Sequence, residues 1–158
     1  MNETNPTKKI EFLILYGSLR FGQTDFHDLK LDEHLERVGN TEINGVLVDL
    51  GSYPGLILKA RGRVYGELYR IKNDSVIAQL DEFERFDRSD RRPLDRTQKT
   101  GSLYIRQAIK LDDGSLAHIY EYNGELIDGE IRSGSIVKCG DWLKHRESQY
   151  TNSNAYSW

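Results

Sequence analysis

Hydrophobic residues recur along the chain in short blocks, and most blocks have the length and pattern of β-strands. Residues 10–16 form a largely apolar run, and residues 43–50 contain a second one. Residues 63–71 alternate with a period of two, which is typical of a strand with one buried face. A shorter run covers residues 135–139. These four blocks are predicted strands.

Two further blocks predict a β-hairpin. Residues 103–111 and 116–123 are both rich in aliphatic and aromatic side chains. The polar sequence Asp112-Asp113-Gly114 separates them, and Asp-Gly is a strong signal for a tight turn between antiparallel strands.

Helical patterns are fewer. Residues 29–38, 74–86 and 141–149 are predicted helices, and the second has polar capping residues at its start. Because strands outnumber helices and do not alternate with them, we expect an α+β fold with a small mixed or antiparallel β-barrel and flanking helices. We expect one domain over residues 9–147, with loose polar termini at 1–8 and 148–158.

Composition narrows the class of protein. The chain has 158 residues, of which 30% are charged and 37% hydrophobic, as in a soluble single domain. Its longest apolar run, Phe12–Leu15, is too short to span a membrane, and no secretory signal precedes it. The single Cys139 cannot form an internal disulfide, so we expect a reducing, cytoplasmic setting.

Charge and histidine placement exclude further classes. A net charge of −3 argues against a general nucleic-acid binder, and nothing indicates a membrane surface as a partner. The histidines are scattered, which gives no support for a metal site. The oligomeric state is left open.

Residues 13–24 come close to a phosphate-binding P-loop. An apolar run is followed by Gly17, Gly22 and Thr24, but Gln23 occupies the position of the required lysine. The expected fold also lacks the strand–helix–strand unit in which a P-loop lies. We therefore do not expect a nucleotide site.

The loop after this apolar run can still bind an anion or a carbonyl oxygen. A sharp turn at Gly17 exposes several backbone N–H groups, and Tyr16 and Arg20 flank it with a hydroxyl and a guanidinium. The alternative is that Tyr16-Gly17-Ser18 is only a turn that ends a strand.

Glu84 has an unusual place in the predicted helix 74–86. At about 100° per residue, Val76, Leu80, Phe83 and Glu84 share one face, whereas Glu82 points to the opposite side. Burial among apolar side chains raises the pKa of a carboxyl group, which suits a proton carrier near neutral pH. The alternative is a boundary glutamate that pairs with one of the arginines after it.

Several short motifs together resemble the γ-glutamylcyclotransferase-like family, in particular its γ-glutamylamine cyclotransferase or AIG2-like branch. Their order and spacing carry the resemblance from about residue 10 to residue 141. The matching segments are Tyr16-Gly17-Ser18-Leu19-Arg20, Gly51-x-Tyr53-Pro54-Gly55-Leu56, Val64-Tyr65-Gly66-Glu67-Leu68-Tyr69, Leu80-Asp81-x-x-Glu84, Tyr104-x-Arg106 and Ala117-His118-Ile119-Tyr120.

The resemblance implies an enzyme that cyclises a small γ-glutamyl metabolite or isopeptide to 5-oxoproline and releases the free amine. It implies that Glu84 is the acid/base catalyst and that the loop Tyr16–Leu19 holds the γ-glutamyl group through Tyr16, Gly17, Ser18 and Leu19. No cofactor or metal is needed for this reaction.

Other candidate residues keep two interpretations. Arg20 and Arg106 either orient a substrate carboxylate or pair with neighbours of Glu84. Tyr104 and Tyr120 either line the substrate cavity or pack in the core.

Two alternatives to the cyclotransferase remain open. One is a non-catalytic module that binds a ligand or a partner on the same fold. The other is a pathway-specific enzyme that removes a γ-glutamyl protecting group. The charged residues 85–101 form a longer connection than the family usually has, either a solvated loop or a lid or contact for an acidic partner. Cys139 is expected to be a small buried residue and not a nucleophile.

Overall fold

The computed structural model describes residues 9–51, 53–84, 104–123 and 136–155, and for residues 150–155 it describes the backbone alone. The charged segment 85–101 and the terminal residues 1–8 lie outside this part of the chain, so the interpretations given for them stay predictions.

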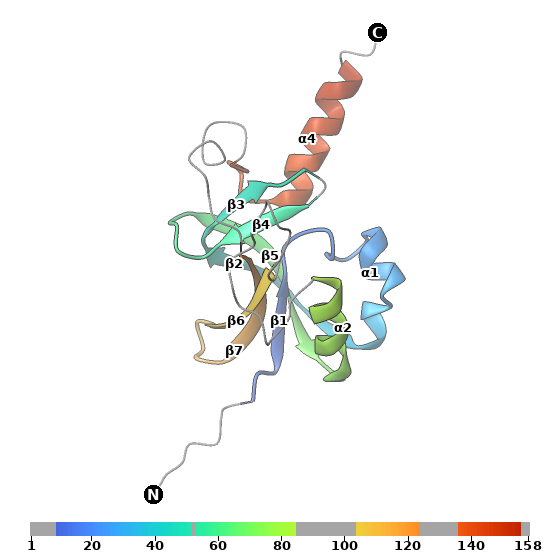
Figure 1. Ribbon diagram of the computed structural model, residues 1–158, viewed down its shortest axis with the longest axis vertical. Coiled ribbons are helices and arrows are strands. Elements are labelled where there is room, and N and C mark those ends of the chain that lie inside the picture. The colour runs from blue at the N-terminus through green and yellow to red at the C-terminus, as the bar shows by residue number, and fades with distance from the viewer. Residues whose placement is uncertain (1–8, 52, 85–103, 124–135, 156–158) are drawn as a thin grey trace, which may run out of the picture.

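The described elements follow one another in the order β1 (Phe12–Leu15), α1 (Thr24–Asp28), a 3-10 helix η1 (Leu31–Glu33), β2 (Leu35–Asn44), β3 (Val46–Asp49), β4 (Pro54–Ile57), β5 (Arg63–Ile71), α2 (Ser75–Phe83), β6 (Tyr104–Lys110), β7 (Leu116–Tyr122) and α4 (Trp142–Ala155). Figure 1 shows α2 beside β1, with α1 next to it, whereas α4 projects away from the strands near β3 and β4.

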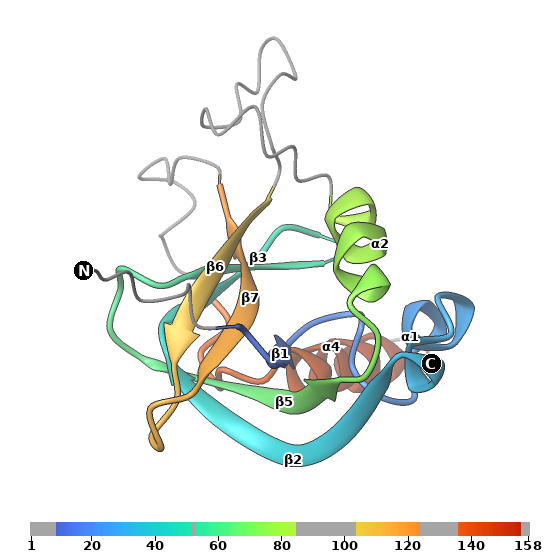
Figure 2. The same cartoon turned by 90° about the horizontal axis from the view of Figure 1, so that it is seen from below.

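The strands form two sheets. A five-stranded sheet has the order β2-β5-β1-β7-β6, and β3 pairs with β4 in a two-stranded sheet. The β1–β7 pair is parallel, and the remaining pairs are antiparallel. In Figure 2 the larger sheet bends, so that β6 and β7 stand steeply to β2 and β5. The α+β class with a mixed sheet is confirmed, but the described strands do not close into a barrel.

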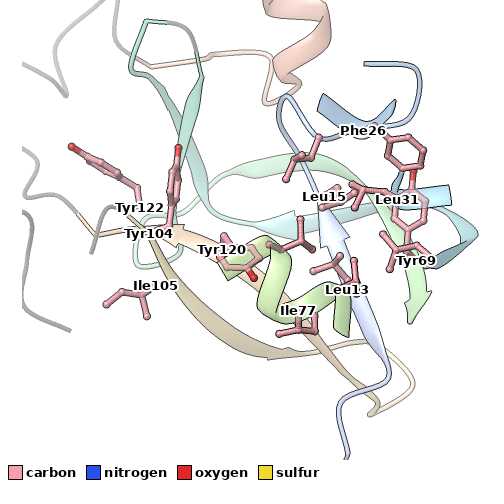
Figure 3. Close-up of a cluster of buried hydrophobic side chains, with 14 residues drawn as sticks. Leu13, Leu15, Phe26, Leu31, Tyr69, Ile77, Tyr104, Ile105, Tyr120 and Tyr122 are labelled. Atoms are coloured by element: carbon pink, nitrogen blue, oxygen red, sulfur yellow. The ribbon is translucent and has the colours of Figure 1, made fainter. Parts of the chain in front are cut away.

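The central strand β1 explains the first apolar run of the sequence. Leu13, Ile14 and Leu15 are each at most 3% exposed, because β1 has neighbours on both sides and is covered on both faces. Leu13 and Leu15 belong to one core cluster and Ile14 to another, as the alternation of side chains along a strand requires. Figure 3 shows the first cluster, with Tyr104 and Tyr122 at one end and Phe26 at the other.

The predicted helix over residues 29–38 is wrong. These residues contain η1 and the first part of β2. Leu31 and Leu35 are buried as a helical pattern would also require, but β2 pairs with β5 from Leu35 to Asn44. The energy of this long antiparallel ladder and its packing outweigh a weak helical propensity.

The predicted strand over residues 43–50 is divided between two sheets. Gly45 separates β2 from β3, and a Cβ atom at Gly45 would lie 2.9 Å from the backbone oxygen of Ile57. The strand β4 was not among the predicted strands, because it begins with Pro54 and Gly55, two residues that usually weaken a strand prediction.

Three further predicted elements differ from the observed ones in where they begin or end. The helix expected over 74–86 ends at Phe83. Ile136 forms only an isolated bridge with Val48 where a strand was expected over 135–139. The terminal helix α4 continues to Ala155, although residues 148–158 were expected to be loose.

Strand directions place several candidate residues at one edge of the larger sheet. Because β1 and β7 are parallel and β6 is antiparallel to β7, the ends of β1 and β7 meet the start of β6. Tyr104 at the start of β6 pairs with Tyr122 at the end of β7. The loop that follows β1 leaves the sheet at this same edge.

The close contact between Gly140 and the backbone of Arg63, at the start of β5, can be tested by substitution. Its φ is +71°, and a Cβ atom there would lie 1.9 Å from the backbone oxygen of Arg63. We expect Gly140→Ala to lower the free energy of unfolding by more than about 2 kcal/mol, measured by urea denaturation. Gly114→Ala is the control, since Gly114 also has a positive φ of +88° but its Cβ would meet nothing within 4 Å. That control should cost about 1 kcal/mol, and equal losses would contradict the packing.

Candidate active site

A cavity of about 310 Å³ lies at the sheet edge where β1 and β7 end. Most of its surface is apolar or aromatic, and its wall combines segments that are far apart in the sequence. The lining residues are Ile14, Leu15, Tyr16, Gly17, Ser18, Leu19, Asp25, Tyr53, Pro54, Phe83, Glu84, Tyr104 and Tyr120.

The loop after β1 contributes Gly17, Ser18 and Leu19 to the lining of this cavity. The Arg20 N–H donates to the Gly17 oxygen at 3.1 Å and closes a tight turn. A Cβ atom at Gly17 would lie 2.9 Å from Cγ of Pro54, so only glycine fits between the loop and β4. Among the described residues, no group accepts the N–H groups of Ser18 and Leu19. These two donors remain available to a ligand.

Arg20 holds this loop and does not line the cavity. Its Nε donates to Glu67 Oε2 at 3.1 Å, and Nη1 donates to Asp141 Oδ1 at 2.9 Å. Glu67 is only 3% exposed and also accepts the backbone N–H of Phe21 and the hydroxyl of Tyr69, at 2.7 and 2.8 Å. Both carboxylates are thus satisfied within the protein, and the contacts of Arg20 do not support a role in binding a substrate carboxylate.

Glu84 lies directly after α2. Its backbone N–H donates to the Leu80 oxygen at 2.8 Å, so Glu84 keeps the helical phase that the sequence predicted. The side chain is partly buried in the cavity wall. Burial, and to a smaller extent the negative charge of Asp25, raises the pKa of Glu84 to about 8. No donor among the described residues binds this carboxyl group, so it faces the cavity unpaired.

Asp81, one turn before Glu84, has the opposite environment. Its carboxylate accepts a hydrogen bond from the Tyr120 hydroxyl at 2.6 Å and pairs with the guanidinium of Arg106. Arg106 therefore makes the pairing contact with a neighbour of Glu84, one of the two roles that the sequence left open. It is absent from the cavity lining.

Two tyrosine hydroxyls connect the segments that line the cavity. The Tyr16 hydroxyl donates to the backbone oxygen of Tyr120 at 2.5 Å, and the Tyr104 hydroxyl donates to the backbone oxygen of Pro54 at 2.6 Å. Burial raises the pKa of the Tyr16 hydroxyl well above its usual range. These hydroxyls are neutral donors that tie β1, β4, β6 and β7 together around the cavity.

Of the predicted site residues, the structure brings Tyr16, Gly17, Ser18, Leu19, Glu84, Tyr104 and Tyr120 to one cavity and leaves Arg20 and Arg106 outside its lining. Sequence reasoning did not select Asp25, Tyr53, Pro54 or Phe83 as site residues. The Tyr53-Pro54 segment carried a signal, since it lies in one of the family motifs. Asp25 lies in a short helix without any motif, so nothing in the sequence identified it.

Other features of the described residues bear on the expected chemistry. No group of three or more His, Cys, Asp or Glu side chains among them could hold a metal ion. Cys139 was expected to be buried, but it is exposed, because it lies in a turn just before α4. Within the same part of the chain, none of the helices has both the length and the apolar composition needed to cross a bilayer.

The chain matches the family described as gamma-glutamyl cyclotransferase, AIG2-like, over residues 13–144. It therefore belongs to this family, as the motifs suggested. A comparison with curated proteins finds no match.

Solved structures share the fold. Protein ytfP from Escherichia coli is 31% identical, with a TM-score of 0.55 over 85% of this chain and 98% of that chain. An uncharacterized protein from Pyrococcus horikoshii is 18% identical, with a TM-score of 0.61 over 89% of this chain and 97% of that chain. An AIG2-like protein from mouse is 20% identical, with a TM-score of 0.50 over 74% of this chain and 80% of that chain.

Removal of the Arg20 guanidinium should destabilise the folded protein. Arg20→Met leaves Glu67 and Asp141 without their shared cation, so we expect a loss of about 3 kcal/mol or more in the free energy of unfolding. Urea denaturation at neutral pH measures this. Arg37→Met is the control, because Arg37 is 3.8 Å from Glu67 and its side chain is 41% exposed, so it should cost less than about 1 kcal/mol. Similar losses in both variants would contradict the assignment.

The burial of Glu84 predicts a pH dependence of stability. The folded protein keeps the Glu84 proton up to about pH 8, whereas an unfolded chain releases it near pH 4.5. The unfolded state thus binds fewer protons between these values, and this group's contribution to stability falls as the pH rises through that range. The Glu84→Gln variant has no carboxyl group at this position, so it does not lose this contribution to stability as the pH rises.

Between about pH 5 and pH 8, the free energy of unfolding of Glu84→Gln relative to wild type should therefore increase by more than about 1 kcal/mol. Glu82→Gln, an exposed position on the same helix, should show no such trend. A flat difference for Glu84→Gln would mean that its carboxyl group is solvated.

Proposed function

We propose that this protein is a γ-glutamyl cyclotransferase that converts a small γ-glutamyl amine or peptide to 5-oxoproline and the free amine. The observation that carries the proposal is that Glu84, Ser18 and Leu19 line one cavity, and that no partner among the described residues binds the Glu84 carboxyl group or the N–H groups of Ser18 and Leu19. Membership of the AIG2-like family supports the reaction class.

The reaction is an intramolecular aminolysis. The α-amino nitrogen of the substrate attacks its own γ-carbonyl carbon and forms the ring C–N bond. The bond between the γ-carbon and the leaving nitrogen then breaks. Attack requires removal of a proton from the α-ammonium group, and departure requires a proton on the leaving nitrogen. A single carboxylate can take the first proton and deliver it to the leaving nitrogen. The ring nitrogen loses a second proton as the lactam forms, and this proton leaves with the released amine, which becomes an ammonium ion.

Glu84 suits this proton transfer. With a pKa raised to about 8, it holds and releases a proton near neutral pH, which an exposed glutamate does not. The desolvated cavity that raises this pKa also limits the access of water to the γ-carbonyl carbon. Ring closure is then favoured over hydrolysis, because the α-amino group is held beside the carbonyl.

The loop donors complete the machinery. As the α-amino group attacks, negative charge develops on the γ-carbonyl oxygen, and the N–H groups of Ser18 and Leu19 are suited to bind it. Arg20 and Arg106 act as positioning residues in this proposal. Arg20 fixes the loop through Glu67 and Asp141, and Arg106 holds Asp81 one turn from the catalyst.

The size of the cavity agrees with a small substrate. A volume of about 310 Å³ is at the lower end of the range usual for small-molecule sites. Such a cavity accommodates a γ-glutamyl group with a short leaving amine. A large leaving group would extend past the exposed side chains of Tyr53 and Phe83.

The test is to incubate the purified protein with γ-glutamyl-ε-lysine, γ-glutamyl-alanine and glutathione and to quantify 5-oxoproline. We expect turnover of at least one compound and a loss of at least about a hundredfold in kcat for Glu84→Gln. Glu82→Gln is the matched control and should retain activity. A folded protein that forms no 5-oxoproline from γ-glutamyl compounds, or a fully active Glu84→Gln, would refute the proposal.

A further inference from the structure

A second acidic side chain lies in the cavity, in addition to Glu84. Asp25, in the short helix α1, is partly buried and forms part of the lining. No donor among the described residues binds its carboxylate. Its charge is close enough to Glu84 to contribute to that residue's raised pKa. The mechanism above does not use Asp25, and the family motifs do not include it.

The surroundings of Asp25 favour a cation. Among the described lining residues, no Lys, Arg or His side chain offers a positive charge to the two carboxyl groups. The aromatic side chains of Tyr53 and Phe83 line the same cavity and are 36% and 39% exposed. Carboxylate and aromatic surfaces together are well suited to an alkylammonium group, which has both a charge and an apolar stem.

We propose that Asp25 is a specificity-determining residue that binds a second ammonium group, carried by the leaving amine of the substrate. The preferred substrates would be γ-glutamyl derivatives of diamines or polyamines. This inference rests on the proposed cyclotransferase function and names the substrate class for it.

The α-ammonium group of the glutamyl moiety is a poorer partner for Asp25. That group must lose a proton before its nitrogen can attack, and a second carboxylate beside it would stabilise the protonated form. Binding there would slow the reaction that Glu84 promotes. A cation at the far end of the leaving amine stays protonated throughout, so its attraction to Asp25 has no such cost.

A matched pair of substrates tests this. Mono-γ-glutamyl-1,3-diaminopropane has a terminal ammonium group, and γ-glutamyl-butylamide has a methyl group in the same place. Wild-type protein should prefer the cationic compound at low salt, and the preference should shrink as salt is added. Asp25→Asn should lower kcat/KM for the cationic compound at least about tenfold, mainly through KM. The neutral compound should change by less than about twofold.

Asp28→Asn is the matched control, because Asp28 is an exposed acid of the same helix and lies outside the cavity lining. Asp28→Asn changes the net charge by the same amount as Asp25→Asn and should leave the preference for the cationic compound unchanged. Thermal denaturation of the Asp25→Asn protein verifies that it is folded. An equal effect of Asp25→Asn on both substrates, or no effect on either, would overturn the proposal.

A binding measurement separates this inference from the proposed function. If neither these two compounds nor the three γ-glutamyl compounds tested above yield 5-oxoproline, the cyclotransferase proposal fails, but calorimetry can still compare the two compounds as ligands. Tighter binding of the cationic compound that disappears in Asp25→Asn supports the cation site. Equal binding of the two compounds by wild-type protein rejects it.

Discussion

The guanidinium group of Arg20, shared between Glu67 and Asp141, is the interaction on which the candidate site depends. Glu67 is almost completely buried in the central sheet, where an unpaired carboxylate would be very costly. Arg20 satisfies it from the loop after β1, and the backbone N–H of Phe21 donates to the same carboxylate. These contacts with one buried carboxylate thus hold the loop that contributes Ser18 and Leu19 to the lining of the cavity.

The two acids Asp81 and Glu84 show how one short helix creates two electrostatic environments. The carboxylate of Asp81 receives the Tyr120 hydroxyl and the Arg106 guanidinium, which hold it in place. Glu84, three residues later, receives no donor among the described residues and lies in an apolar cavity wall. Its carboxyl group therefore retains a proton near neutral pH. Three residues of helical rotation thus separate a carboxylate that is held by two donors from a carboxyl group whose pKa is raised to about 8.

Much of the site could be predicted because it depends on local geometry. The helical phase of residues 76–84 selected Glu84 over Glu82, and the glycine after the first apolar run identified the donor loop. What the sequence could not provide was the partner of each charged residue. Arg20 contacts Asp141 across 121 positions of chain, and Asp25 reaches the cavity only because α1 folds against that edge. The helix wrongly expected over 29–38 has the same origin, since pairing of β2 with β5 is not local.

The parallel pair of β1 and β7 has a consequence for biosynthesis. Phe12 pairs with Ala117, and Arg20 meets Asp141 near the beginning of α4. A chain emerging from the ribosome therefore exposes its apolar first strand long before the partners that cover it have been made. Closing such distant contacts is slow, and the nascent protein remains susceptible to aggregation during that interval. The lining of the cavity stays incomplete until Tyr120 has been translated.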